Sequence, residues 1–290
     1  MAVGGKATKR SRYGSTIEDQ VKRTLEATKI VAEAGLRLHL IDAEWRINDV
    51  PPSELENLLN SFPTVRTIVT VAARRRDAEQ ILKLYIPLIE EAGNAGLCIV
   101  PGNNIYLDDD ERGLNPYKSV KKILDQAYRR VSRILLGVEG LEGRLDEIVK
   151  TYPEVKLFFL YDEEKLGDLQ LYSSRGVQCG VYVPYAIDLP ELDVVKSLLD
   201  YALRRRWFRD EASRVLETLD PSRIELSRLP PDAMSVLAKG VSRLCVYGTL
   251  SEVLEKLRKI RSCGASFIVG LPLRDTPEQV HAFSSCLKSM

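Results

Sequence analysis

Residues Tyr247–Leu271 read YGTLSEVLEKLRKIRSCGASFIVGL, and this stretch decides the fold. Thr249 and Glu252 have the spacing of a capping box, in which a hydroxyl and a carboxylate satisfy the free N–H groups at a helix start. Apolar residues then recur at helical spacing, and Gly264 follows at the place where helices end in a left-handed residue. Phe267–Val269 is an apolar run typical of a buried strand. The stretch therefore predicts strand, helix, glycine and strand.

The same order of elements recurs near the start of the chain. Ser15 and Glu18 form a second capping box, Gly35 closes the predicted helix, and an apolar strand begins at Leu36. Residues 134–138 fit either a strand or the end of a helix, and the strand is favoured. The predicted strands are 36–41, 66–72, 97–100, 134–138, 155–161, 177–183, 244–247 and 267–269.

Strands that alternate with helices predict a parallel sheet, because each parallel pairing requires a crossover connection. Eight such repeats in 290 residues favour an α/β fold of the (β/α)8 TIM type, complete or degenerate, over an open sheet. A long helical region, 190–218, would be inserted before the last two strands. Ligands of either fold bind at the carboxyl ends of the strands.

Residues 1–14 differ in composition from the rest of the chain. They contain four cations, no acidic residue and almost no apolar pattern, although a short strand near Arg12–Gly14 is an alternative. We expect a flexible basic tail whose removal changes stability little, because the segment offers nothing to bury. Residues 15–290 would form a single barrel domain.

Composition excludes several classes of protein. Lys and Arg number 42 against 41 Asp and Glu, a net charge of +1, which argues against general nucleic-acid binding. No apolar run approaches the roughly 18 residues of a membrane span or resembles a signal peptide, so we expect a cytoplasmic protein. The charged fraction of 29% is compatible with a thermophilic source.

The sequence gives little support for a metal centre or for a Ser-His-Asp catalytic triad. The five cysteines lack C-x-x-C spacing, which argues against zinc and iron–sulfur sites, and their pairing in disulfides stays open. Only two histidines exist, His39 within a predicted strand and His281 in the predicted terminal helix, so both are expected to be structural. The acidic run Asp108–Glu111 is interpreted as a solvated loop rather than a cation site.

Charged residues follow two of the predicted strands, where a barrel places its active site. Asp42 and Glu44 come directly after strand 36–41, and carboxylates there are candidate catalytic acids or bases. The alternative is an ordinary solvated loop. Arg74, Arg75 and Arg76 follow strand 66–72 and precede a helix start, where cations invite an anion such as a phosphate. A plain charged surface is the alternative.

The segments around Tyr247–Leu271 resemble the luciferase-like flavin and deazaflavin oxidoreductases, which include the methylenetetrahydromethanopterin reductases. Members of that superfamily carry Gly-Thr-Pro before an amphipathic helix, then an alanine–glycine pair and an apolar strand ending in glycine and proline. The matching positions here are Gly248-Thr249-Leu250, Cys263-Gly264 and Phe267–Pro272, with leucine in place of the first proline. The resemblance implies a barrel, a cofactor that is FMN or the deazaflavin coenzyme F420, and hydride transfer.

Residues at the predicted carboxyl ends of the strands are candidates to bind such a cofactor. Backbone N–H groups in the loop after strand 97–100 would approach the cofactor, with an ordinary turn as the alternative, and the hydroxyl of Thr249 would bind its phosphate. No metal ligand is predicted. The candidates are Arg74, Arg75, Arg76, Gly102, Asn103, Asn104, Tyr247, Gly248 and Thr249.

Two functions remain open from the sequence, so whether the chain is an enzyme is undecided. The first is an oxidoreductase that transfers a hydride with a flavin or deazaflavin and a small-molecule substrate. The second is a barrel that has lost cofactor binding, a pseudoenzyme that acts as a binding or assembly protein. The partners expected are small molecules, with no membrane and no general nucleic acid, and a homo-oligomer is an option.

Overall fold

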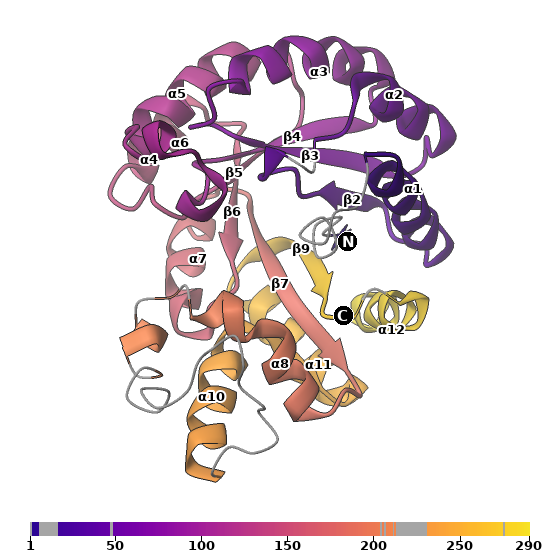
Figure 1. The fold of residues 1–290 in the computed structure, drawn as a ribbon, viewed down its shortest axis with the longest axis vertical. Coiled ribbons are helices and arrows are strands. Elements are labelled where there is room, and N and C mark those ends of the chain that lie inside the picture. Colours follow the sequence, from indigo (N-terminus) through magenta and orange to yellow (C-terminus); the bar gives the residue numbers. More distant parts are fainter. Residues whose placement is uncertain are drawn as a thin grey trace.

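The structure, a computed structural model, describes residues 2–5, 17–46, 49–203, 205, 207–210, 212, 231–274 and 276–290. Within them a sheet of nine strands, all paired in parallel, alternates with helices (Figure 1). The strands are β1 (Ala2–Gly5), β2 (Leu38–Ile41), β3 (Arg66–Ala72), β4 (Ala95–Val100), β5 (Ile134–Gly137), β6 (Lys156–Leu160), β7 (Cys179–Ile187), β8 (Val246–Gly248) and β9 (Ala265–Pro272). The predicted strand at 134–138 is confirmed as β5.

Eleven α-helices occur in the described part of the chain, and they surround the sheet (Figure 1). They are α1 (Ile17–Glu33), α2 (Pro52–Ser61), α3 (Ala78–Ala92), α4 (Asp109–Arg112), α5 (Pro116–Ala127), α6 (Leu145–Thr151), α7 (Leu166–Ser173), α8 (Glu191–Ala202), α10 (Pro231–Leu244), α11 (Leu250–Ser262) and α12 (Pro277–Lys288). None of these helices is long and apolar enough to cross a membrane.

Eight of the strands close into a ring, which confirms the predicted barrel. The order is β1, β2, β3, β4, β5, β6, β7 and β9, and β9 pairs again with β1. Closure places the carboxyl ends of all eight strands at one opening and their amino ends at the other. Solved barrels of this type carry their active sites at the carboxyl opening, so that opening is the first place to look for a site.

Strand β8 lies outside this ring, which differs from the predicted arrangement. Its partner β7 has nine residues, whereas β6 pairs with β7 only up to Tyr182. Tyr185 then pairs with Val246 of β8 on one side and with Pro272 of β9 on the other. β6 therefore pairs with the first half of β7, and β8 pairs with the last residues of β7, Tyr185–Ile187, beyond the end of β6. Which strands become neighbours depends on their lengths, and the sequence pattern does not set those lengths sharply.

Strand β1 takes the place in the ring that the sequence analysis gave to no strand. Ala2–Gly5 pairs with Leu38–Ile41 of β2, and its first two residues also pair with β9. The prediction of a flexible tail is therefore wrong for residues 2–5. The segment AVGG has little strand propensity of its own, and the pairing comes from two distant strands. Residues 6–16, including the alternative strand near Arg12–Gly14 and the capping box at Ser15, lie outside the described residues.

Deleting residues 1–5 should lower the melting temperature by about 5 °C or more, because the loss of β1 leaves β2 and β9 with unpaired edges. Differential scanning calorimetry of the full and shortened chains checks this. A Val3→Pro variant should reproduce much of the effect, since proline removes a ladder N–H, whereas Val3→Ala keeps the backbone intact. Equal melting temperatures for the full and shortened chains would restore the tail interpretation.

Side chains alternate between the inside of the barrel and the helices around it. The interior is apolar and includes Leu40, Ile68, Leu135, Phe158 and Tyr182. The outward positions of the same strands join the larger core beneath the helices. The barrel is thus a packed core, and a ligand at its carboxyl opening would rest on apolar side chains.

His39 points outward from β2 and is structural, as expected. Its Nδ1 lies 2.8 Å from the hydroxyl of Thr28 in α1, and that hydroxyl donates to the carbonyl of Thr24 at 2.7 Å. Since the Thr28 proton is already used, its oxygen accepts from His39, which places a proton on Nδ1. Burial lowers the pKa of His39 from 6.5 to about 4.

The segment between β7 and β8 builds a second, smaller core beside the barrel. Helices α8 and α10 pack together around Phe208, with side chains such as Val194, Leu237 and Val241. The predicted helical region 190–218 begins as α8, and residues 213–218 lie outside the described residues. The five cysteines form no disulfide, and four of them are buried.

Candidate functional site at the carboxyl ends of the strands

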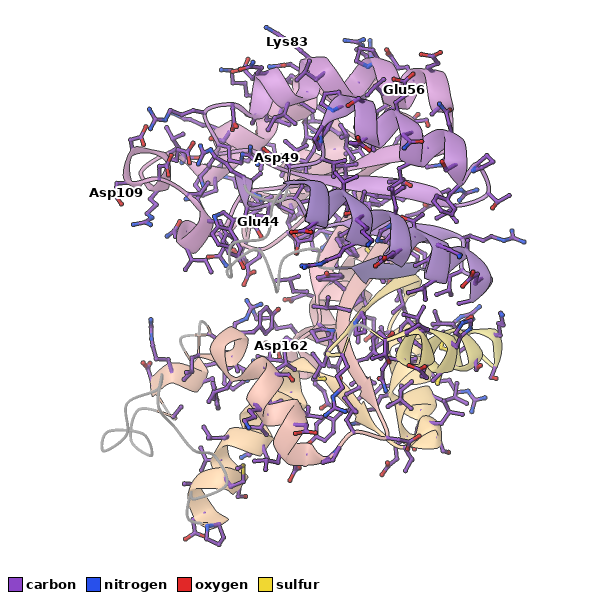
Figure 2. All side chains as sticks on the ribbon, turned by 45° about the vertical axis from the view of Figure 1, so that its right-hand side comes forward. Glu44, Asp49, Glu56, Lys83, Asp109 and Asp162 are labelled. Carbon is purple, nitrogen blue, oxygen red and sulfur yellow. The ribbon has the colours of Figure 1, made fainter. Side chains whose placement is uncertain are left out.

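The loops that follow β2, β3 and β4 meet at the carboxyl opening. Their strands are neighbours in register, with Ile41 opposite Val69 and Ala72 opposite Val100. The loops carry Asp42 and Glu44, the three arginines, and Gly102–Asn104, so most of the predicted site residues come together here. In Figure 2, Glu44 and Asp49 lie on the side of the molecule that also carries Asp109.

Glu44 ties the loop after β2 to the loop after β4, since its carboxylate accepts a hydrogen bond from the backbone N–H of Asn103. The Asn103 side chain accepts from the N–H of Ile105 at 3.2 Å and starts a short 3-10 turn. Gly102 before it has a φ of +97°, a conformation that favours glycine. The N–H of Asn103, one of those expected to approach a cofactor, is therefore used within the chain.

Arg74 is buried and holds the same loops from the other side. Its Nε donates to the carbonyl of Pro101 at 3.1 Å, and its Nη2 donates to that of Gly102. Its Nη1 donates to the carbonyl of Arg112 at 3.2 Å. Burial lowers the pKa of Arg74, and the negative charge of Glu44 partly offsets this. Three carbonyl acceptors make Arg74 a support for the loops.

Arg75 is also buried, with 1% of its side chain exposed, and it is shared by two carboxylates. It donates to both oxygens of Asp49, at 2.7 and 2.5 Å, and to both oxygens of Asp77, at 2.9 and 2.7 Å. Burial alone would lower the pKa of this guanidinium, but the hydrogen bonds to the two carboxylates outweigh it and the pKa is raised. An anionic ligand would have to compete with both carboxylates for Arg75.

Arg76 is the arginine of the three that reaches water, with 64% of its side chain exposed. Its guanidinium lies 2.8 Å from Asp110, and its backbone N–H donates to Glu111 at 2.7 Å. Glu111 is itself fully buried and accepts from Arg46 and from the N–H of Asp108. The acidic run is thus part of an ion-pair network, not simply a solvated loop. No cluster of metal-ligating side chains occurs in the described part of the chain.

A group of polar side chains sits where the barrel interior meets this opening. Cys98 faces the interior of the barrel, with the hydroxyl of Thr70 on the neighbouring strand. Burial raises the pKa of the Cys98 thiol, and the negative charges of Asp42 and Glu44 raise it further. Both carboxylates are half-buried. The thiol is therefore neutral, and the negative charges of the two carboxylates reach the barrel interior at its carboxyl end.

Two aromatic rings flank this group at the rim. Trp45 follows Glu44, Tyr106 ends the short turn after β4, and their rings stack with centroids 5.7 Å apart and planes 23° apart. Neither ring was among the predicted site residues. The position of Trp45 after a predicted strand was a usable signal, whereas nothing local pairs it with a tyrosine sixty-one positions later.

Tyr247 and Gly248 lie on β8 and Thr249 caps α11, and among the described residues no hydrogen bond or ion pair links them to the arginine loops. The predicted capping box is confirmed, since the N–H of Thr249 donates to Glu252 at 2.7 Å and its hydroxyl accepts from the N–H of Glu252 at 3.4 Å. The Tyr247 hydroxyl donates to Glu191 of α8 at 3.0 Å. Glu252 thus already occupies the N-terminus at which a phosphate was expected.

A second charged group, which the sequence analysis missed, follows β6. Asp162 is buried and accepts from Arg243 of α10 at 2.6 and 2.8 Å, which raises the pKa of that guanidinium. The guanidinium also lies 3.8 Å from the ring centroid of Trp207. Asp162 directly follows a predicted strand and could have been selected on that ground; Arg243 gave no such signal. The pair fastens the inserted helices to the rim of the barrel.

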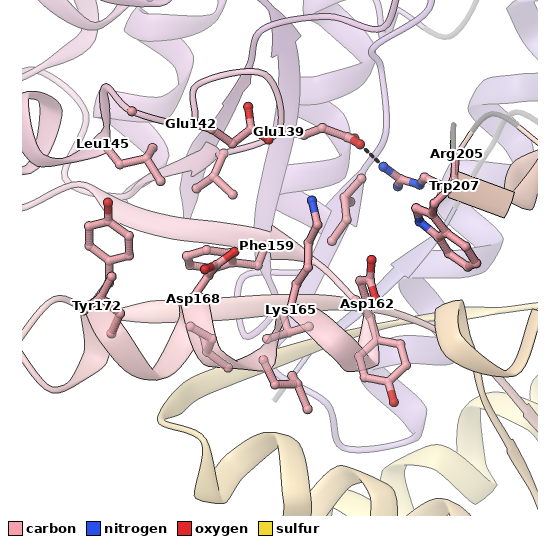
Figure 3. Close-up of a pocket in the computed structure, with 18 residues that line it drawn as sticks. Glu139, Glu142, Leu145, Phe159, Asp162, Lys165, Asp168, Tyr172, Arg205 and Trp207 are labelled. Atoms are coloured by element: carbon pink, nitrogen blue, oxygen red, sulfur yellow. Dashed lines mark ion pairs between the residues drawn. The ribbon is translucent and has the colours of Figure 1, made fainter. Parts of the chain in front are cut away.

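A pocket of about 440 Å³ opens beside this pair, between α6 and α7 (Figure 3). Phe159, Leu166 and Leu169 give it an apolar lining, and the ion pair of Glu139 with Arg205 lies at one side. None of the predicted site residues lines this pocket. Its lining includes Glu139 after β5 and Asp162 after β6, so it lies beside the rim at those strands, whereas the predicted arginine and carboxylate residues lie on the loops after β2, β3 and β4.

A model of the family of unknown function DUF7388 matches residues 19–279, which is most of the chain. The chain belongs to the DUF7388 family. This DUF7388 protein is also 30% identical over 171 residues to an uncharacterized protein of Methanocaldococcus jannaschii, an overlap that covers 59% of the chain and 67% of that relative.

The DUF7388 chain has the fold of the luciferase-like flavin and deazaflavin enzymes, which confirms the resemblance at the level of fold. A coenzyme F420-dependent tetrahydromethanopterin reductase from Methanopyrus kandleri superposes with a TM-score of 0.64 at 12% identity, covering 98% of this chain and 97% of that one. A type II Baeyer–Villiger monooxygenase from Pseudomonas putida, solved with FMN, gives 0.60 at 11% identity and covers 98% and 97%. An F420-dependent secondary alcohol dehydrogenase gives 0.59 at 9% identity and covers 99% and 98%.

Proposed function

We propose that this chain is a luciferase-like oxidoreductase that binds a flavin or the deazaflavin coenzyme F420 at the carboxyl opening of the barrel. The observation that carries the proposal is the pair of half-buried carboxylates, Asp42 and Glu44, above an apolar barrel interior. Structural neighbours with this fold include enzymes named for F420 and one solved with FMN. The bound cofactor would supply the hydride chemistry.

The residues at the opening fit such a cofactor in part. A flat aromatic ring system requires apolar and aromatic surfaces, which the barrel interior and the stacked Trp45 and Tyr106 offer. A phosphate requires a cation, and Arg76 is the exposed arginine of the three. Arg74 and Arg75 would support the loops from beneath, since their donors are used within the chain.

The residues of this chain would then have separate roles. Asp42 would accept or hold a proton at its carboxylate, next to the reacting atoms. Glu44 would position the loop after β4 through the N–H of Asn103. The aromatic pair would shield the opening from water. Tyr247, Gly248 and Thr249 are also proposed as cofactor-binding residues. To bind the phosphate, the N–H of Thr249 would have to exchange its hydrogen bond to Glu252 for one to the cofactor.

The second candidate function is a barrel that has lost cofactor binding and serves as a binding or assembly protein. One observation favours it: the groups that were predicted to bind the cofactor already form hydrogen bonds to carboxylates of this chain. Asp49 and Asp77 hold Arg75, Glu44 holds the N–H of Asn103, and Glu252 caps α11. Each of these acceptors takes a donor that was expected to meet the cofactor or its phosphate.

Titration of the purified chain with FMN, and separately with coenzyme F420, should give a dissociation constant below about 1 mM for one of them, followed by cofactor fluorescence. Arg76→Ala should weaken that binding about tenfold, because it removes a charge-assisted hydrogen bond to the phosphate. Arg130→Ala is the matched control, since Arg130 is likewise exposed and pairs with a surface carboxylate, that of Glu90, at 2.9 Å. Failure of both cofactors to bind at millimolar concentration would leave the second candidate function.

A further inference from the structure

Three cations gather at the opposite end of the barrel from the proposed cofactor site. Arg66 is the first residue of β3, Lys156 is the first residue of β6, and Arg133 directly precedes β5. The backbone of Arg133 already belongs to the ladder, because its carbonyl accepts from the N–H of Leu97 in β4 at 3.0 Å. All three therefore stand at the amino ends of strands within one run of neighbours, β3 to β6.

The strand alternation turns these three side chains toward the barrel axis. Ile68, Leu135 and Phe158 belong to the interior cluster, and each lies two positions after one of the cations on the same strand. Residues two apart on a strand share a face. Arg66, Arg133 and Lys156 thus lie on the inward face of their strands along one side of the amino opening, where Arg133 and Lys156 are half-buried and Arg66 is exposed.

A glycine makes room for this arrangement. Gly96 is the inward-facing residue of β4, between the strands that carry Arg66 and Arg133. A Cβ at Gly96 would lie 2.8 Å from Cβ of Arg133 and 2.5 Å from its carbonyl oxygen. It would also lie 2.8 Å from Cδ1 of Ile68, so the position accommodates no side chain, and the glycine lets Arg133 and Ile68 pack against the backbone of β4.

The three cations have no carboxylate partner among the residues that the structure describes. Within the described part of the chain Arg66, Arg133 and Lys156 form no ion pair, and the one hydrogen bond from these side chains runs from Arg133 to the carbonyl of Gly93 at 2.7 Å. At the carboxyl opening, by contrast, Arg75 has two carboxylates and Arg46 has three. Burial lowers the pKa of Lys156, and the positive charges of Arg66 and Arg133 lower it further, so the three charges repel one another.

We infer that the amino opening of the barrel is a binding site for a phosphate group, held by Arg66, Arg133 and Lys156. Three inward cations match a doubly charged phosphate better than a single carboxylate, and the two guanidinium groups offer paired donors to its oxygens. The ring of strands limits the site to a small ligand. Inorganic phosphate and a small phosphomonoester share this chemistry. The site does not depend on a cofactor at the other opening.

The test is calorimetric titration of the full chain with inorganic phosphate and, separately, with ribose 5-phosphate, at constant ionic strength set with NaCl. Wild-type protein should bind at least one of them, and Lys156→Met should weaken that binding about tenfold or more. Whichever ligand binds more tightly distinguishes the free ion from the ester. Lys83→Met is the matched control, because Lys83 lies on the outer face of α3, away from both openings (Figure 2).

A melting experiment separates loss of the site from loss of the fold. Without phosphate, Lys156→Met should melt at or above the wild-type temperature, because the substitution removes a repelled charge. With phosphate, the wild type and Lys83→Met should gain stability and Lys156→Met should not. Absence of binding to the wild type, or equal phosphate stabilisation of all three proteins, would overturn the inference, since phosphate also stabilises proteins without a specific site.

Discussion

Arg75→Met should lower the free energy of unfolding by about 2–4 kcal/mol, measured by urea denaturation at neutral pH. The substitution keeps much of the side-chain volume but removes every donor that Asp49 and Asp77 share. Breaking a buried ion pair on one side costs about 3–5 kcal/mol in general. We expect somewhat less here, because 34% and 36% of the two aspartate side chains are exposed and water can solvate them.

Arg76→Met, at the next residue, should change the free energy of unfolding much less than Arg75→Met. Its guanidinium is largely exposed and pairs with exposed Asp110, so its loss should cost less than about 0.5 kcal/mol. A similar loss for both variants would show that the clamp formed by Asp49, Arg75 and Asp77 contributes little. The pair of variants also separates the supporting arginine from the one proposed to meet a phosphate, because stability and cofactor affinity should respond to different residues.

Acidification from pH 6.5 to about 4 should cost the wild-type chain about 3 kcal/mol through His39 alone. Burial lowers the pKa of His39 in the folded chain to about 4, while an unfolded chain has the ordinary value of 6.5. Between these values the unfolded state binds the proton and the folded state does not, so stability falls as the pH falls. Well above pH 6.5 both states are neutral and the contribution is constant.

Urea denaturation of wild type and His39→Gln at a series of pH values isolates this contribution, because carboxylates titrate in both proteins. Glutamine does not titrate, and its amide can still donate to Thr28. The curve of His39→Gln should therefore be flatter than that of the wild type between pH 4 and 6.5. His281→Gln, at an exposed position in α12, is the matched control. Parallel curves for wild type and His39→Gln would contradict a buried neutral histidine.

Much of the fold could be predicted from the sequence because the signals are local. The capping box of Thr249 with Glu252 and the apolar runs of β3 and β9 identify helix and strand within a few residues. The ring itself depends on contacts between distant segments. Ala2–Gly5 becomes a strand only because β2 and β9 supply partners, and β8 leaves the ring because β7 is longer than its neighbour β6.

The site could be predicted in position but not in its contacts. A residue directly after a parallel strand reaches the carboxyl opening, which correctly placed Asp42, Glu44 and Arg74 at the rim. Whether a rim cation is free depends on residues far along the chain. The partners of Arg75 include Asp49, 26 positions away, and Glu111 reaches Arg46 across 65 positions. The use of the predicted residues as catalytic or cofactor-binding groups stays a prediction.

The position of β8 also bears on how copies of this chain behave toward one another. Strands in the closed ring have neighbours on both sides, so they offer no row of free N–H and C=O groups to another molecule. Among the described strands, β8 alone is paired on one side only, and it has just three residues, the last of which is a glycine with a φ of +136°. So short and bent an edge is a poor template for intermolecular strand addition. The native barrel should therefore resist sheet-driven aggregation, which would have to begin with the opening of the ring.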